Sequence, residues 1–313
     1  MYHIVNCEID NIESAQWGSA LNGEIHCING ECVKVEKKII FLDVDGTLTE
    51  AGSNEPPESA VWAIHQAREE GHYVFLCTGR NYDMLSPLLK YEFDGVIASS
   101  GGYIECQGKV IYDCPMSEEQ KKSALDILKK NGVYRTVECM DGAYTDEEFK
   151  EYLRSHVQEG DNSELLRWRE QIEKSLHILP MGEYREQPIY KIVIACASRE
   201  QLLEPQSVLS SDFEFCIQDK DVGGFVNGEV VNREFNKGKA IRRICEYLHM
   251  PIYNSVAIGD SMNDKEMMVT AGLSICMGNG SRELKRISDD VCPSVGEDGI
   301  RTAFLRHHLI HCR

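Results

Sequence analysis

Sequence features that would direct this chain to a membrane or to secretion are missing. No run of about 18 apolar residues occurs, so no membrane-spanning helix is expected. The opening stretch, MYHIVNCEIDNIESAQW, carries acidic side chains and lacks the long apolar core of a signal peptide. We therefore expect a cytoplasmic protein with no membrane partner.

Basic residues are also scarce, and they are not clustered. The 313 residues include 33 Lys and Arg against 51 Asp and Glu, which gives a net charge of −18. An acidic surface without a basic block repels the phosphate backbone of nucleic acids, so no nucleic-acid partner is expected. An anionic substrate would need a local cation to offset this field.

Cysteine is abundant, but its spacing matches no zinc or redox motif. The 13 cysteines include no C-x-x-C pair, and their number is odd. Several lie inside apolar runs, so we expect mostly buried thiols in a reducing compartment. We interpret Cys77 in the same way, as a small buried side chain and not a redox-sensitive site.

The chain alternates between apolar strands and helices. The pattern predicts strands at 39–43, 72–80 and 94–102, helices at 55–71 and 81–92, then a helix at 236–250 and strands at 255–260 and 273–279. Apolar strands that alternate with helices are typical of a parallel sheet covered on both faces. We therefore predict an α/β fold with a doubly wound, Rossmann-like parallel sheet.

The middle of the chain departs from this alternation and predicts an inserted α+β domain. The expected elements are a hairpin at 103–113, helices at 117–132, 145–160, 163–179 and 199–209, and strands at 189–198 and 213–218. Ser117 and Gln120 fit a capping box. The predicted domains are an N-terminal extension (1–37) with a β-hairpin turning at Asn29-Gly30, a core (38–102 and 229–313) and a cap (103–228).

Four short motifs lie at the ends of predicted core strands or at the start of the following helix. They are DVDGT (43–47), CTGR (77–80), NKGK (236–239) and GDSMND (259–264). Ligands bind at this edge of a doubly wound sheet. Asp43 and Asp45 leave their strand on the same side, where they repel each other unless a cation lies between them. Asp260 adds a third carboxylate, and oxygen ligands without His or Cys suit Mg²⁺.

The other motif residues complement a phosphoryl group. Lys237 can neutralise its charge, and Thr78 and the backbone around Gly79 can donate hydrogen bonds to its oxygens. The pattern predicts covalent phosphoryl transfer, in which Asp43 attacks phosphorus and Asp45 acts first as acid and then as base. Mg²⁺, held by Asp43, Asp45 and Asp260, would bind the phosphoryl oxygens.

The order of these motifs resembles the haloacid dehalogenase superfamily of phosphatases over about residues 38–313. FLDVDGTLT, FLCTGR, NKGKAI and GDSMNDKEMM look like its first to fourth motifs, with Asp43 as nucleophile, Asp45 as acid/base, Thr78, Lys237, and Asp260 as metal ligand. Gly79, Arg80 and Asn263 are then candidate substrate-binding residues, and Asp264 is a supporting residue.

The insert lies between the second and third motifs, which resembles the Cof-type subgroup with the larger α/β cap. The stretch 277–300 is also similar to that subgroup. The resemblance implies a Mg²⁺-dependent phosphatase for a small phosphorylated metabolite, either a sugar phosphate or a cofactor or nucleotide phosphate. The resemblance implies that the cap selects the substrate. No motif marks the residues responsible, and 181–186 and 220–229 are candidates. Ser100 stands where the subgroup usually has Asn, and residues 1–36 fall outside the pattern.

Two other functions fit parts of the same pattern. A phosphomutase of the phosphomannomutase type shares the nucleophile and the cap class, but it returns the phosphoryl group to its substrate. The fourth motif here resembles the Cof-type version better. A catalytically idle ligand-binding module would usually have lost a motif residue, and all of them are present.

Overall fold

The computed structural model describes residues 23–28, 31–149, 151, 178–217 and 226–311. The strands of its larger sheet are β3 (Ile39–Leu42), β4 (Tyr73–Cys77), β5 (Gly95–Ala98), β6 (Tyr103–Cys106), β7 (Lys109–Asp113), β14 (Ser255–Gly259), β15 (Leu273–Cys276) and β16 (Asp290–Val291). Their spatial order is β16-β15-β14-β3-β4-β5-β6-β7, and the strands from β16 to β5 run parallel. The predicted α/β fold with a parallel sheet is confirmed.

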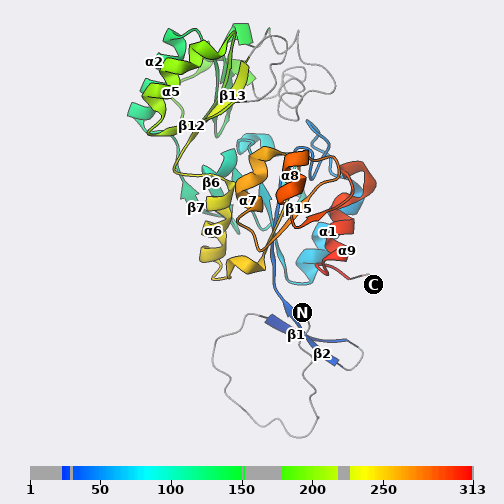
Figure 1. Cartoon of the computed structure of the whole chain (residues 1–313). Helices are drawn as coiled ribbons and strands as arrows, with labels where there is room; N and C mark the ends of the chain where they lie inside the picture. Colours follow the sequence, from blue (N-terminus) through cyan, green and yellow to red (C-terminus); the bar gives the residue numbers. More distant parts are fainter. Residues whose placement is uncertain (1–22, 29–30, 150, 152–177, 218–225, 312–313) are drawn as a thin grey trace.

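Helices cover both faces of this sheet (Figure 1). They are α1 (Glu58–Glu69) and α9 (Gly299–Arg306) on one face, and α6 (Lys237–Tyr247), α7 (Lys265–Met268) and α8 (Arg282–Ile287) on the other. The alternation of side chains along β3 accounts for the two cores. Ile40 and Leu42 pack with α1 and α9, while Ile39 and Phe41 pack with α6 and α7.

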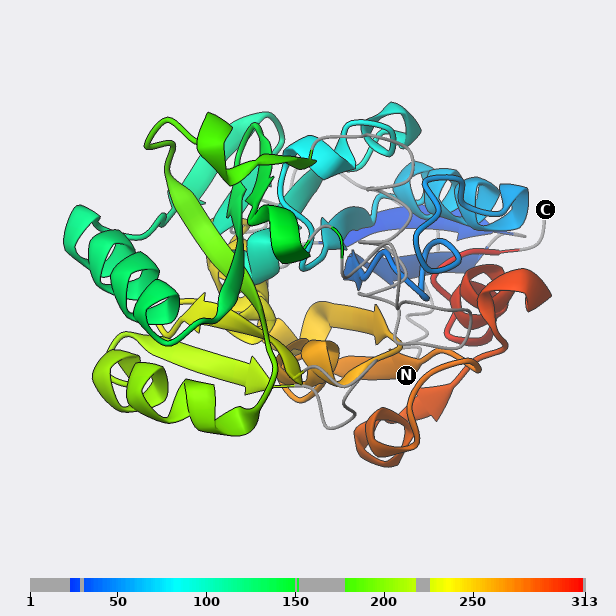
Figure 2. The ribbon, with the colours of Figure 1, turned by 90° about the horizontal axis from the view of Figure 1, so that it is seen from above.

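A second sheet and its helices form a separate unit, as both views show (Figure 1, Figure 2). Its strands are β8 (Tyr134–Cys139), β9 (Gly142–Thr145), β10 (Ile178–Pro180), β11 (Ile189–Cys196), β12 (Phe213–Ile217) and β13 (Val226–Asn232), in the order β10-β9-β8-β11-β13-β12. Helices α2 (Glu118–Lys130) and α5 (Leu203–Leu209) pack on one face. We call this unit the cap. The predicted Ser117–Gln120 capping box is present.

The N-terminal hairpin has the predicted strands, β1 (Gly23–Ile28) and β2 (Glu31–Glu36), which pair antiparallel. Its turn at Asn29-Gly30 lies outside the described residues. Most of the two helices predicted at 145–160 and 163–179 also lies outside them, as does the first part, 220–225, of the candidate specificity segment at 220–229. The end of the second predicted helix, at Ile178, is instead part of strand β10.

The helix predicted at 81–92 is wrong. The chain forms two short 3₁₀ turns instead, Asp83–Leu85 and Leu89–Tyr91. Pro87 lies between them, and it lacks the backbone N–H that a continuous helix would need there. Glu92 then closes the segment in the left-handed conformation, with φ of 59°.

The pairing of β6 and β7 differs from the predicted division of the chain. This hairpin was assigned to the cap, but β6 pairs antiparallel with β5 and β7 with β6, so both strands extend the larger sheet. The hairpin covers the edge of β5, and β7 becomes the edge strand of the sheet. At the other end of the cap, β13 continues to Asn232, past the predicted boundary at 228. The domain limits themselves stay a prediction.

Two expectations from composition can be compared with the structure. Nine cysteines between residues 77 and 292 are free, and seven of them are buried; Cys114 is half-buried and Cys216 is exposed. Among the helices of the described ranges, none combines the length and the apolar composition that crossing a membrane requires.

Candidate active site

The turn after β3 brings the first carboxylate pair to the carboxyl edge of the sheet. Asp43 and Asp45 are 3% and 7% exposed. Gly46 follows with φ of +84°, and its amide donates to the carbonyl of Thr49 at 2.8 Å. A side chain at Gly46 would place a Cβ 2.4 Å from Oδ2 of Asp260, so the turn fits against that carboxylate only with glycine.

Lys237 joins two of the site carboxylates. It is the first residue of α6, whose N-cap is Asn236, and its Nζ lies 2.7 Å from Oδ1 of Asp43 and 2.5 Å from Oδ1 of Asp264. Burial acts to lower the pKa of Lys237, but the carboxylates of Asp264 and Asp43 raise it well above its usual range. The side chain therefore stays an ammonium beside the predicted nucleophile.

Two carboxylates of the site, Asp43 and Asp260, have raised pKa values. Burial, and then the charge of Asp264, raise the pKa of Asp43 to about 7 and that of Asp260 to about 9. Oδ1 of Asp260 is buried and has no hydrogen-bond partner within the part of the chain that the structure describes. A cation at this place would supply the missing interaction.

The donor set fits a hard divalent cation. Asp43, Asp260 and Asp264 each offer a carboxylate oxygen, and these oxygens lie within 4.8 Å of one another. Asp264 is already engaged, because it binds Lys237 through Oδ1 and accepts from the amides of Asp260 and Ser261 through Oδ2. The supporting role of Asp264 stays a prediction, as does the binding of a metal by Asp43 and Asp260.

Asp45 faces a different partner from the predicted metal. Its Oδ2 accepts from Nε of Arg80 at 2.9 Å, and its Oδ1 accepts from a terminal nitrogen of Arg80 at 2.7 Å and from the amide of Gly52 at 3.1 Å. The guanidinium is also bonded to Asn54 and to the carbonyl of Ser53. Arg80 was a candidate substrate-binding residue; the structure places it on Asp45. A metal contact by Asp45 stays a prediction.

The second motif follows β4. Thr78 is buried, its amide donates to the carbonyl of Ile97 at 2.9 Å, and its hydroxyl accepts from the amide of Arg80 at 3.1 Å. Burial raises the pKa of the neighbouring Cys77 thiol, which keeps it neutral and unreactive, in line with our interpretation of it as a core side chain.

The segment where Ser100 replaces the usual Asn supports this loop through its backbone. The amide of Ser99 donates to the carbonyl of Arg80 at 2.7 Å, and that of Ser100 donates to the carbonyl of Thr78 at 2.9 Å. Both serines have positive φ, of 48° and 58°. Asn263, a candidate substrate-binding residue, is exposed and accepts from the hydroxyl of Ser261 at 2.7 Å.

Three polar residues at the site were missed in the sequence. The side-chain amide of Asn279 donates to the carbonyl of Gly46 at 2.7 Å, and the side-chain amide of Asn81 donates to the carbonyl of Gly142 in the cap at 3.2 Å. Lys191 of the cap donates to the carbonyl of Gly79 at 3.0 Å. Only Lys191 carried a signal that could have been noticed, since a lysine inside the apolar run IYKIVIAC needs a buried partner.

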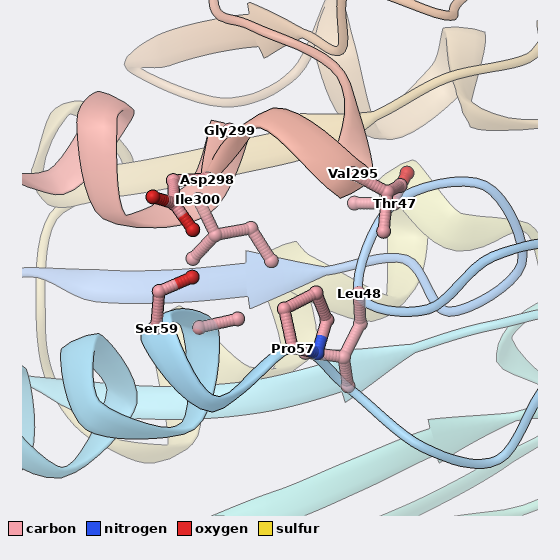
Figure 3. A pocket seen from close by; sticks show the side chains of 9 residues that line it. Thr47, Leu48, Pro57, Ser59, Val295, Asp298, Gly299 and Ile300 are labelled. Atoms are coloured by element: carbon pink, nitrogen blue, oxygen red, sulfur yellow. The ribbon is translucent and has the colours of Figure 1, made fainter.

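A shallow hollow, with no room for a water-sized molecule, lies behind the turn that contains Gly46 (Figure 3). It is lined by Thr47, Leu48, Pro57, Ser59, Ala60, Val295, Asp298, Gly299 and Ile300. Its lining includes neither the carboxylates nor the lysine of the site. The hollow is therefore not the predicted substrate site.

Comparisons with known proteins agree with the motifs. Residues 40–304 match the family model of the haloacid dehalogenase-like hydrolases. Phosphatase YwpJ of Bacillus subtilis (strain 168) is 26% identical over 290 residues, which cover 87% of this chain and 100% of that one. The HMP-PP phosphatase of Yersinia pseudotuberculosis (serotype O:1b, strain IP 31758) is 26% identical over 257 residues, covering 80% and 86%.

Solved structures show the same fold. A protein from Geobacillus kaustophilus HTA426 superposes with a TM-score of 0.70 at 26% identity, covering 88% of this chain and 100% of that one. BT1666 of Bacteroides thetaiotaomicron, a phosphatase of the HAD superfamily, also gives a TM-score of 0.70, at 18% identity, with 88% and 96% covered. The predicted architecture of core and cap thus recurs in both.

Proposed function

The chain belongs to the haloacid dehalogenase-like hydrolases, and from this premise we propose that it is a Mg²⁺-dependent phosphatase of a small phosphorylated metabolite. Relatives named as phosphatases match almost the whole chain, which supports this activity. The observation that carries the proposal is the buried group of Asp43, Lys237, Asp264 and Asp260, in which a carboxylate, an ammonium and a cation site meet at one strand edge.

We assign the nucleophile to Asp43. One of its carboxylate oxygens attacks phosphorus, the bond from phosphorus to the leaving oxygen breaks, and an aspartyl-phosphate forms. Lys237 holds Asp43 in place and offsets the charge that develops on the phosphoryl oxygens. When bound by Asp43 and Asp260, Mg²⁺ would supply further charge neutralisation for those oxygens.

Asp45 is the proton carrier in this proposal. It gives a proton to the leaving oxygen in the first step and takes one from the attacking water in the second, which releases inorganic phosphate and restores Asp43. Two guanidinium nitrogens of Arg80 donate to the two oxygens of Asp45 and fix the orientation of its carboxylate. Because each carboxylate oxygen has two lone pairs, Asp45 can carry a proton while Arg80 keeps its orientation.

The test is hydrolysis of 4-nitrophenyl phosphate with and without Mg²⁺. We expect turnover that needs Mg²⁺ and a loss of about 10³-fold or more in kcat for Asp43→Asn, because the amide cannot attack phosphorus. Wild-type activity in Asp43→Asn would contradict the nucleophile. Release of free phosphate without a bisphosphate activator separates hydrolysis from the mutase reaction.

A further inference from the structure

Asn81 is a buried asparagine whose side chain joins the loop after β4 to the cap. It is 0% exposed, and its side-chain amide donates to the carbonyl of Gly142, the first residue of β9, at 3.2 Å. The side-chain oxygen of Asn81 accepts from the backbone amide of Met84 at 3.0 Å. Both ends of this side chain are therefore engaged, one with the cap and the other with the core.

The carbonyl that Asn81 binds belongs to a part of the cap that packs on the core. Met140, two residues before Gly142 in the turn between β8 and β9, packs against the apolar cluster that the larger sheet forms with α1 and α9. Tyr190 of β11 is buried in the same cluster, and its hydroxyl donates to Asp113 of β7 at 2.6 Å. These contacts hold this part of the cap on the core, so the carbonyl of Gly142 is a fixed acceptor for Asn81.

Arg80 lies between two residues that bind the cap. On one side, the carbonyl of Gly79 accepts from Lys191 of the cap at 3.0 Å, and on the other, Asn81 donates to the cap. Arg80 itself donates two hydrogen bonds, of 2.9 and 2.7 Å, to the carboxylate of Asp45. A series of direct contacts thus runs from the cap, through this loop, to the residue that we assign to proton transfer.

We propose that Asn81 is a positioning residue, which couples the docking of the cap to proton transfer by Asp45. With the cap docked, Asn81 fixes the loop from which Arg80 extends, and Arg80 orients the Asp45 carboxyl toward the leaving oxygen. As the bond from phosphorus to that oxygen breaks, the proton of Asp45 passes to the oxygen, and the leaving group departs as a neutral alcohol or phenol. The inference rests on the proposed phosphatase function and adds to it a residue that acts through Arg80.

The inference predicts how the effect of Asn81 depends on the leaving group. Phenyl phosphate needs a proton as its oxygen leaves, because phenoxide is a strong base, whereas the dinitrophenolate of 2,4-dinitrophenyl phosphate leaves as a stable anion. The measured quantity is kcat/KM for phenyl phosphate divided by kcat/KM for 2,4-dinitrophenyl phosphate. Since kcat/KM covers only the steps up to the departure of the leaving group, hydrolysis of the shared aspartyl-phosphate does not enter this ratio.

Asn81→Ala and Asn81→Asp should each lower this ratio by about tenfold, because Asp45 is then less well aligned with the leaving oxygen. The aspartate keeps an acceptor for Met84 but offers no N–H to Gly142. A fall in both variants therefore assigns the effect to the link with the cap, and a fall in Asn81→Ala alone would contradict that link. The ratio does not depend on the folded fraction of a sample, since both substrates meet the same enzyme.

Asp45→Asn is the reference for complete loss of the proton donor. It should lower the ratio by about 10²-fold or more. If the ratio falls in Asp45→Asn but stays at the wild-type value in both variants of Asn81, this inference alone is overturned. An unchanged ratio in Asp45→Asn would refute proton transfer by Asp45 and the inference with it. If the wild type hydrolyses neither ester, the proposed function itself fails.

Asn254→Ala is the matched control. Asn254 is also a buried asparagine of the core, and its side chain accepts from Nζ of Lys38 at 2.9 Å. It directly precedes β14, at the end of the sheet opposite the site. The control variant should unfold at a lower temperature than the wild type but should keep the wild-type ratio, because its lost hydrogen bond has no connection to Arg80. A ratio lowered as far as in Asn81→Ala would show that general loosening of the core is sufficient, which contradicts the inference.

Discussion

Individual carboxylates at the site are arranged for a ligand and not for the stability of the free protein. Asp260 is the clearest case, since its Oδ1 is buried without a hydrogen-bond partner among the described residues and its pKa is raised to about 9. A buried polar atom without a partner is costly, and such atoms are rare in folded proteins. A cation bound to Oδ1 of Asp260 would supply the missing interaction and would explain why this oxygen is buried.

Asp260→Asn should therefore stabilise the metal-free protein. Between pH 3.8 and about 9 the folded state binds more protons at Asp260 than the unfolded state does, so stability falls as pH rises through this window. Asparagine does not titrate, and the free energy of unfolding in EDTA at pH 8 should rise by on the order of 2–4 kcal/mol. Denaturant unfolding measures this.

The same variant should lose its response to Mg²⁺. In the wild type, added Mg²⁺ should raise the unfolding temperature, and in Asp260→Asn this rise should shrink or vanish, because one of the two ligands is gone. An undiminished rise would mean that the metal binds elsewhere.

For individual residues, the sequence identified the side chains of the site but not all of the hydrogen bonds between them. Asp43, Lys237 and Asp260 come together as expected, because the ends of parallel strands share one edge. The hydrogen bonds from Arg80 to Asp45 could not be predicted from the sequence, since they depend on how two loops approach each other in three dimensions.

Among the elements, the turn after β3 is the one whose geometry is most tightly fixed. Its glycine combines a left-handed backbone with a close approach to a carboxylate, and each of these alone disfavours a side chain. The turn therefore sets the position of Asp260 as well as those of the two aspartates that precede the glycine.

Gly46→Ala should separate these two effects when it is compared with Gly108→Ala. Both glycines have positive φ, of +84° and +74°, but a Cβ at Gly108 meets nothing within 4 Å. Both variants should lose about 1 kcal/mol from backbone strain. Gly46→Ala alone should also lower kcat by about tenfold or more and weaken Mg²⁺ binding, because Asp260 has to move.

Equal kinetics for the two alanine variants would show that Asp260 can shift without consequence. The readouts are kcat for 4-nitrophenyl phosphate, the Mg²⁺ concentration that gives half-maximal rate, and the free energy of unfolding in denaturant.

Elements with strong periodicity were predicted well, and short ones were not. The buried strands β3, β4, β5, β11 and β14 and helices α1, α2 and α6 were all expected. The helix predicted at 81–92 does not form, because Pro87 divides the segment. Strands β8 and β9 were missed because YRTVEC and GAYT lack the continuous apolar runs of the core strands, and β10 lies where the sequence predicts the end of a helix.

The molecule as a whole is held together partly by a buried histidine at the end of the sheet opposite the active site. Nδ1 of His72 accepts from the amide of Lys38 at 3.0 Å, and only 4% of the residue is exposed. Burial lowers the pKa of His72 to about 4. The C-terminal segment is tied nearby, where the amide of His311 donates to Glu70 at 2.9 Å.

Global stability should consequently fall in mild acid. Above pH 6.5 His72 is neutral in both states; as pH falls from 6.5 toward 4 the unfolded state takes up the proton first, and up to about 3 kcal/mol of stability is lost. His72→Asn keeps an acceptor for Lys38 and should flatten this part of the pH profile. His249→Asn, at an exposed left-handed position, should leave the profile as in the wild type.

Denaturant unfolding from pH 4 to 8 decides between these outcomes. An identical acid loss in His72→Asn and the wild type would mean that other groups control it. This feature could not be predicted from the sequence, because a histidine at the start of a strand is as often exposed as buried.

The pairing of β14 with β3 has a consequence for how the protein is made. The two strands lie side by side, with Ser255 opposite Ile39, although the whole cap separates them along the chain. Asp43 and Asp260 follow these two strands directly. During synthesis on the ribosome, β3 cannot pair with β14 until the whole cap has emerged, while the strands of the cap sheet can already pair with one another. The site can thus assemble only after β14 and the Asp260 that follows it have emerged, long after Asp43 has been made.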